Sequence, residues 1–467
     1  MVRPRAIVSA LAVAVLAFGG GLDSAHAATA ASAPEFTVLP TSVLVGSLAG
    51  YGGQLNQHVY ADLSGPPPDL PGLEGKVLAF EPQFVRVFFN TTEWTFADRM
   101  ASFERAVLLA RRANAQIDVT WQGSTVPYAL SHMSQFADVL TDLLRTHEVE
   151  SLWVTLFNEP NSTKITLPQY EQVYRTLDRE LRDRGVRDRI RFMGGDLVLD
   201  GQAAWFDYMA AHMGDLLDAW SIHVFWDFWD TGKIESRLAG VRQVFSRLPA
   251  AQRRPLYIAE FGVRGIRSFE GERIFEPGEW LDGAPMPETN VAAFQEAWFV
   301  VRAAELGFVA ASKWDFFDAT YDAGTQDYSM IGPGSAGWPL RPTYNVMRLF
   351  TLAARPTWSI VDVARAPGAD PAKLAAAYAS PGGNVSVVGL DTEGAQLNGE
   401  LGRGVSWSIG GLPAKTLFRL LLWNGDGSGT TREVGYLDSG ADGVARFDAP
   451  LGSVFALTSA PYDPIFG

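Results

Sequence analysis

Residues 152–161 are Leu152-Trp153-Val154-Thr155-Leu156-Phe157-Asn158-Glu159-Pro160-Asn161. The first six form a short apolar run of residues that favour strands, and the run ends abruptly in polar residues and a proline. A second stretch, 256–262, has the same plan, since Leu256-Tyr257-Ile258-Ala259 is followed by Glu260-Phe261-Gly262. Each stretch therefore predicts a strand whose carboxyl end has a glutamate.

On both sides of these stretches, short β-rich runs alternate with longer amphipathic segments. This alternation is typical of a parallel sheet with crossover helices, and eight strands over about 310 residues match the size of a (β/α)₈ TIM barrel. The predicted strands are Val43–Leu48, Phe84–Phe89, Gln116–Trp121, Leu152–Phe157, Ile190–Gly195, Trp220–Val224, Leu256–Glu260 and Ala311–Asp315. The predicted helices are Ala97–Asn114, Ser131–His147, Leu167–Arg184, Gly201–Met213, Ile234–Arg247, Asn290–Leu306 and Pro342–Leu352.

An open doubly wound sheet is the alternative α/β fold. It would require a glycine-rich phosphate loop after an early strand. Gly50 to Gly53 reads GYGG, which lacks the GxGxxG spacing and a following helix. The barrel is therefore favoured.

After Arg355 the helical periodicity stops, and short alternating runs separated by Gly, Asn and Asp turns take over. This pattern predicts an antiparallel β-sandwich over residues 355–467, following a catalytic barrel over residues 41–354. The lead-in, residues 28–40, contains Phe36–Leu39, which could add a strand to the sandwich.

The first 27 residues have the pattern of a secretory signal peptide. Arg3 and Arg5 precede an apolar run from Ala6 to Phe18, and Ala25-His26-Ala27 is a small-x-small cleavage signature. A membrane anchor is the alternative, but the apolar run is too short to span a bilayer. We therefore expect a secreted, extracellular protein without a membrane anchor.

Composition excludes several classes of function. The formal net charge is −14, so the chain repels nucleic acid and anionic membranes, and a neutral partner fits better. The chain contains no cysteine, and its six histidines show no HxxxH or HExxH spacing. We expect no metal, no cofactor and a monomer.

The two glutamates have the arrangement that glycoside hydrolysis requires. Strands four and seven of a closed barrel lie across its mouth from each other, so Glu159 and Glu260 would meet in one cleft. One carboxyl group would protonate the departing oxygen while the other attacks the anomeric carbon, which retains the configuration if they are about 5–5.5 Å apart. A capping or ion-pairing role is the structural alternative for either glutamate alone.

Together, these stretches resemble glycoside hydrolase clan A, and the Phe157–Asn161 segment with the appended sandwich is most similar to family 39, with family 5 second. The resemblance implies that Glu159 is the acid/base and Glu260 the nucleophile, with Asn158 bonded to a sugar hydroxyl. It also implies that Arg86 holds the nucleophile, that His223 lies near the proton donor, and that Trp314 forms the floor under the sugar. A structural ion pair for Arg86, and plain packing for His223 and Trp314, are the alternatives.

Two positions depart from the clan pattern. Phe225 occupies the place where many relatives have a tyrosine bonded to the nucleophile, and Trp121-Gln122 ends the third strand where family 5 often has a histidine. Trp121 and Trp226 lie near predicted strand ends, and we expect both to bind substrate, with plain packing as the alternative for Trp226.

The sequence therefore predicts a secreted retaining β-glycosidase that acts on an oligo- or polysaccharide. A transglycosylase with the same site and a non-catalytic carbohydrate-binding protein are the alternatives.

Overall fold

The structure is a computed structural model of the chain. It describes residues 33–57, 59–61, 69–91, 93–123, 125–198, 202–264, 280–281, 284–285, 288–317, 328–395 and 401–461. The predicted signal peptide and residues 28–32 of the lead-in lie outside the described residues. The described chain from Pro34 onward forms one compact unit.

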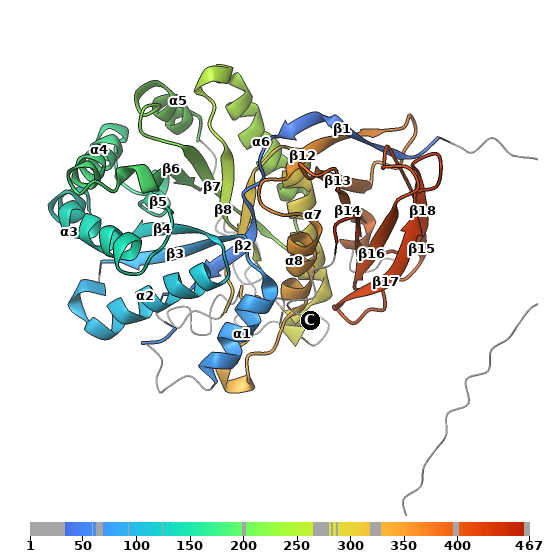
Figure 1. Cartoon of the computed structure of the whole chain (residues 1–467), viewed down its shortest axis with the longest axis horizontal. Coiled ribbons are helices and arrows are strands. Elements are labelled where there is room, and N and C mark those ends of the chain that lie inside the picture. Colours follow the sequence, from blue (N-terminus) through green and yellow to red (C-terminus); the bar gives the residue numbers. More distant parts are fainter. Residues whose placement is uncertain are drawn as a thin grey trace, which may run out of the picture. The chain divides into compact units, whose positions relative to one another are not determined.

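Eight parallel strands close into a barrel, which confirms the predicted (β/α)₈ architecture (Figure 1). Around the barrel, each strand pairs with the next in the order β11-β2-β3-β4-β5-β6-β7-β8. The bounds are β2 Gly50–Leu55, β3 Phe84–Asn90, β4 Gln116–Gln122, β5 Leu152–Leu156, β6 Ile190–Leu197, β7 Ala219–Asp227, β8 Leu256–Arg264 and β11 Ala310–Lys313. Glu159 thus follows the fourth barrel strand, β5, and Glu260 lies in the seventh, β8.

The predicted first strand was wrong. Val43 to Val45 belong to β1 (Phe36–Val45), which pairs outside the barrel, and the first barrel strand is the glycine-rich β2. Its glycines are required by close packing, because a Cβ on Gly52 would lie 1.9 Å from the carbonyl oxygen of Phe84. Strand propensity is low for glycine, so this strand has no propensity signal.

Helices cover the outside of the barrel, including one absent from the predicted set, α1 between β2 and β3. Local signals set their ends: in α4 the side chain of Gln169 accepts from the Thr166 backbone N–H in a capping box. The bounds are α1 Leu70–Phe80, α2 Ala97–Arg112, α3 Val126–Arg145, α4 Leu167–Asp183, α5 Ala203–His212, α6 Gly232–Arg247, α7 Asn290–Glu305 and α8 Pro342–Ala353.

A second sheet of nine strands follows the barrel and corresponds to the predicted sandwich. Its order is β17-β16-β19-β14-β13-β12-β1-β15-β18, and every pairing is antiparallel except the one between β1 and β15. The bounds are β12 Ser359–Arg365, β13 Lys373–Ala379, β14 Val385–Asp391, β15 Gly404–Gly410, β16 Leu417–Trp423, β17 Thr431–Asp438, β18 Ala445–Pro450 and β19 Val454–Thr458. The sheet encloses an apolar core that includes Phe36, Trp407 and Phe455.

The outer face of this sheet shares a core with the barrel. In β13, Leu374, Ala376 and Tyr378 belong to the barrel core, while Ala375 and Ala377 belong to the sandwich core. This alternation is the period-2 pattern of a strand buried on both faces. The hydroxyls of Tyr51 and Tyr378 lie 2.6 Å apart and join the first barrel strand to the sheet. Among the described residues, no helix has the length and apolar character that crossing a bilayer requires.

Candidate active site

The two glutamates converge at the carboxyl end of the barrel. One oxygen of Glu159, one oxygen of Glu260 and a ring nitrogen of His223 all lie within 4.8 Å of one another. The two environments differ, because the Glu159 side chain is 29% exposed whereas that of Glu260 is 6% exposed. The site therefore contains one carboxyl group open to solvent and one held in the barrel interior.

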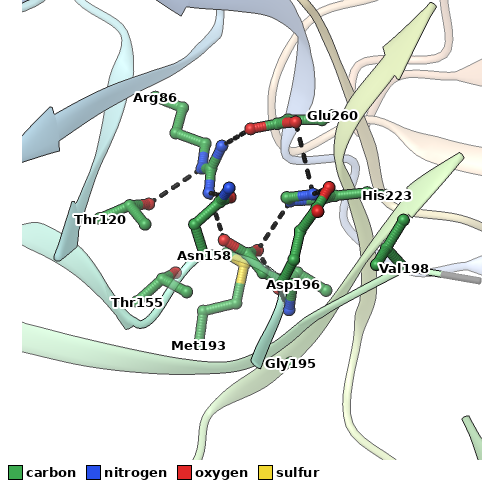
Figure 2. Close-up of polar contacts among 12 residues, drawn as sticks. Arg86, Thr120, Thr155, Asn158, Met193, Gly195, Asp196, Val198, His223 and Glu260 are labelled. Atoms are coloured by element: carbon green, nitrogen blue, oxygen red, sulfur yellow. Dashed lines mark hydrogen bonds and ion pairs between the residues drawn. The ribbon is translucent and has the colours of Figure 1, made fainter. Parts of the chain in front are cut away.

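Arg86 holds the buried glutamate. Its guanidinium lies in the barrel interior with no exposed surface and donates to Glu260 Oε1 (Figure 2). All five of its N–H groups have acceptors: besides Glu260, these are Thr120 Oγ1 at 2.9 Å, Gln54 Oε1 at 3.1 Å, Asn158 Oδ1 at 3.0 Å and an oxygen of Asp196. A buried guanidinium with every donor satisfied fixes the positions of all its neighbours.

Asn158 has a defined orientation because of Arg86. A guanidinium only donates hydrogen bonds, so the atom of Asn158 that faces it must be the carbonyl oxygen Oδ1. The amide Nδ2 then points away from Arg86 with its two N–H groups. A donor in this position, next to Glu159 in sequence, can bond a sugar hydroxyl, as the resemblance to clan A implies.

His223 bridges the two glutamates and a third carboxylate, that of Asp196. Its Nδ1 is 3.1 Å from Glu159 Oε1 and 3.4 Å from Glu260 Oε2, while its Nε2 is 3.4 Å from Asp196 Oδ1 (Figure 2). Burial lowers the pKa of His223, but the negative charges of Glu260 and Asp196 and its hydrogen bonds outweigh burial and raise the pKa to about 10. The imidazole is therefore a cation at neutral pH.

Asp196 was missed by the sequence analysis, which ended the fifth strand one residue earlier. It is fully buried, and Ser221 Oγ donates to its Oδ1 at 2.7 Å. Burial raises the pKa of Asp196, but Arg86 and His223 more than offset burial and hold it below its usual range. A charged residue after the apolar run of residues 190–195 was the available signal, because such a charge needs partners.

Asp118 is a second buried acid that the sequence analysis missed, although it lies inside the predicted strand Gln116–Trp121. It accepts hydrogen bonds from Thr155 and Thr120 and lies 3.9 Å from Arg86 Nε. Burial and the nearby Asp196 raise the pKa of Asp118 to about 7. Its proximity to Arg86 makes it part of the charge network beneath the two glutamates.

Burial also raises the pKa of Glu260, and the neighbouring cations His223 and Arg86 oppose the rise. Because Arg86 holds Oε1, the oxygen that remains for chemistry is Oε2, on the side of His223.

Three of the eleven described non-glycine residues with positive φ lie at the same strand ends. Phe157, Glu159 and Asp196 have φ angles of 67°, 51° and 51°, in the left-handed region that non-glycine residues seldom adopt. Such conformations cost about 1–3 kcal/mol each and persist where the surrounding structure enforces them, commonly at functional sites.

Trp314 lies beside this cluster, whereas two other tryptophans do not. Trp314 is partly exposed and packs on Phe88, with ring centroids 5.7 Å apart, and Phe88 in turn stacks on the Arg86 guanidinium. Trp121 and Trp226 are fully buried and face the helix layer, where Trp121 packs on Phe136 and Trp226 on Phe299.

The expectation that Trp121 and Trp226 bind substrate is therefore corrected. Successive strand side chains point to opposite faces, and Thr120 and His223 already face the barrel interior. Trp121 must then face outward, as must Trp226, three residues after His223. Phe225, the departure from the clan pattern, packs against Tyr328 with centroids 5.8 Å apart.

Two groups of described residues are close enough together to ligate a metal ion. One is the Glu159, His223 and Glu260 cluster itself, in which Arg86 already pairs with Glu260. The other, on the outer helices, consists of Glu104, Asp142 and His147, which are all partly or fully exposed.

The comparisons with solved protein structures agree with the fold described above. No protein-family model and no curated protein sequence matches the chain. Among solved structures, a family 51 alpha-L-arabinofuranosidase from Bifidobacterium longum superposes with a TM-score of 0.61 at 13% identity over 91% of this chain and 100% of that one. The chain has the fold of these glycosidases.

Two further structures extend the likeness. A family 39 (GH39) beta-xylosidase from Caulobacter crescentus has a TM-score of 0.57 at 13% identity and covers 91% of this chain and 99% of that one. A glucosidase from Croceicoccus marinus has a TM-score of 0.59 at 14% identity over 91% and 98%. The glycosidase fold thus extends over both the barrel and the appended sheet.

Proposed function

We propose that the chain is a retaining β-glycoside hydrolase acting on an oligo- or polysaccharide, with Glu159 as acid/base and Glu260 as nucleophile. The observation that carries this proposal is the approach of the two carboxylates, since an oxygen of each lies within 4.8 Å of the other. Retaining enzymes have their carboxyl groups about 5–5.5 Å apart, whereas inverting enzymes need about 6.5–9.5 Å to admit a water molecule.

In the first step, Glu260 Oε2 attacks the anomeric carbon while Glu159 gives its proton to the departing glycosidic oxygen. The C–O bond to the leaving group breaks and an ester bond to Glu260 forms. Arg86 keeps Glu260 ionised and its carboxylate fixed, and the Asn158 amide donates to a sugar hydroxyl next to the reacting carbon.

In the second step, Glu159 takes a proton from water, and the resulting hydroxide displaces Glu260 from the anomeric carbon. The difference in exposure fits this division of roles. Glu159 must meet both the leaving group and the incoming water, and its side chain is the more exposed of the two. Glu260 must meet only the sugar, from a buried position.

The solved structures support the class of reaction. Their names describe a glucosidase, a xylosidase and an arabinofuranosidase, so the proposal concerns the reaction and not one particular sugar. A complete acid pair with its arginine and amide also favours an enzyme over a non-catalytic binding protein. Export is part of the proposal and depends on the signal-peptide pattern of residues 1–27.

A screen of aryl glycosides tests the proposal. We expect Glu260→Gln to reduce activity by roughly 10⁴-fold or more, and Glu159→Gln to reduce it with partial rescue by azide, which needs no base. Glu148→Gln is the matched control, because that side chain is 78% exposed and pairs with Arg111 on the surface. Full activity in Glu260→Gln would overturn the proposal.

A further inference from the structure

A second polar cavity lies away from the barrel mouth, between α8 and the strands β16 and β17. Its volume is about 220 Å³, and residues from Glu81, at the end of α1, to Pro461, after β19, line it. Figure 1 shows α8 beside the second sheet, and α8 contacts both strands. The cavity is therefore built from both parts of the compact unit and is separate from the Glu159 and Glu260 cluster.

Four arginines face this cavity in a chain whose net charge is −14. They are Arg348, Arg355, Arg419 and Arg432, against two lining glutamates, Glu81 and Glu433. Three of the arginines have carboxylate partners: Arg355 lies 2.7 Å from Glu81, Arg419 lies 3.8 Å from Glu433, and Arg432 lies 3.5 Å from Asp426. These three arginines therefore belong to a network of ion pairs that needs no ligand.

Arg348 is not explained by such a network. Its Nε is buried from solvent and has no hydrogen-bond partner among the described residues, while the side chain as a whole is partly exposed. A buried donor without a partner costs about 1–3 kcal/mol. An anion in the cavity would remove this cost, because a guanidinium binds a carboxylate through two parallel hydrogen bonds.

The size and the walls of the cavity restrict the anion. Pockets for drug-sized ligands occupy roughly 300–1,000 Å³, so an occupant of about 220 Å³ is no larger than a single sugar. Leu352 and Leu421 add an apolar wall, which suits the C–H face of a sugar ring and would be wasted on inorganic phosphate. Asn345 and Thr431 also line the cavity, although their side-chain donors already bond backbone carbonyls: Asn345 Nδ2 donates to Gly429 O at 3.2 Å, and Thr431 Oγ1 donates to Asn345 O at 2.8 Å.

We propose that this cavity binds a carboxylated monosaccharide of the uronic acid class, with Arg348 as the main contact to its carboxylate. The site does not depend on the chemistry of Glu159 and Glu260. It gives the second sheet a role in binding acidic sugar ends away from the cleft.

Isothermal titration calorimetry of the full chain with D-glucuronate, D-glucose and inorganic phosphate tests this site. We expect saturable binding of glucuronate and none of glucose, because glucose lacks the carboxylate. Arg348→Gln should weaken glucuronate binding by roughly 10-fold or more. Arg446→Gln, an exposed substitution in the same sheet, should leave it unchanged.

Several outcomes would overturn the proposal. These are the absence of saturable glucuronate binding, equal binding by Arg348→Gln, and phosphate binding as tight as glucuronate with the same dependence on Arg348. Thermal unfolding of each variant reports whether it folds. If Arg348→Gln does not fold, Arg348→Lys keeps the charge but not the planar fork, and it should still weaken binding.

Discussion

Asp196→Asn is the substitution whose consequences the site geometry specifies most completely. Arg86 only donates, so the new amide must turn its oxygen toward Arg86 and its NH₂ group toward Ser221 and His223. A donor facing Nε2 requires that nitrogen to be unprotonated. The substitution should therefore convert the His223 imidazolium into a neutral imidazole, although it changes almost no volume.

The magnitude follows from the charges around His223. A pKa raised from 6.5 to about 10 corresponds to roughly 5 kcal/mol at about 1.36 kcal/mol per pKa unit. Removing the Asp196 charge leaves burial, which lowers the pKa, opposed mainly by Glu260, and we expect the His223 pKa to fall well below its value in the parent. Breaking a buried charge pair also costs roughly 3–5 kcal/mol of folding stability.

The pH dependence has a defined sign. Because folding raises the pKa of His223, its stabilising contribution is complete below pH 6.5 and is lost as the pH rises toward 10. In Asp196→Asn the His223 pKa is lower, so this contribution is smaller and is lost at lower pH than in the parent. The difference in unfolding free energy between the parent and the variant should therefore be largest at pH 6 and should narrow steadily up to pH 10.

Urea unfolding at pH 6, 8 and 10 measures this difference, and an NMR titration of the imidazole measures the pKa directly. In the pH profile of kcat/KM, the acidic limb should move to higher pH, because the neutral imidazole no longer opposes the rise in the pKa of Glu260. Asp442→Asn, at an exposed ion pair, is the control. An unchanged His223 pKa together with a stability difference that does not vary with pH would refute the reasoning.

Two further predictions concern the barrel and the sugar floor. Gly52→Ala should prevent the barrel from closing, because its Cβ would lie 1.9 Å from the Phe84 carbonyl oxygen. Gly46→Ala is the control, because a Cβ at Gly46 meets open space and should change the unfolding free energy by less than about 0.5 kcal/mol. Thermal melting followed by circular dichroism compares the two variants. Trp314→Ala should raise KM by roughly 10-fold, because the sugar loses its stacking partner. Trp226→Phe should lower the melting temperature and leave KM unchanged, because Trp226 packs in the core. Steady-state kinetics and melting curves measure both effects, and an equal rise in KM for the two variants would contradict the prediction.

Much of the fold was readable because its signals are local and strong. Seven of the eight barrel strands and the strands after Arg355 were predicted from apolar runs bounded by turn residues. The exception, β2, is formed by glycines selected for close packing against β3, a requirement that arises only when the barrel closes. A propensity argument cannot anticipate it.

The site was readable to the extent that it depends on residues at strand ends. Glu159, Glu260, Arg86, Asn158 and His223 all lie in one cluster because β-strand ends converge in a closed barrel. Which face a residue near a strand end points to depends on an alternation that a bulge can shift, and β8 has such an irregularity, because its pairing steps from Ile258 to Glu260 while β7 steps from Ile222 to His223. The orientation of the two buried tryptophans therefore required coordinates.

The most direct test of the central claim is to trap the covalent intermediate. The chain is incubated with a panel of activated 2-deoxy-2-fluoro glycosides, and the labelled peptide is sequenced by mass spectrometry. The account predicts one glycosyl adduct per chain, on Glu260, and none in Glu260→Gln. An adduct on another residue, or efficient turnover of aryl glycosides with inverted product and no adduct, would contradict it.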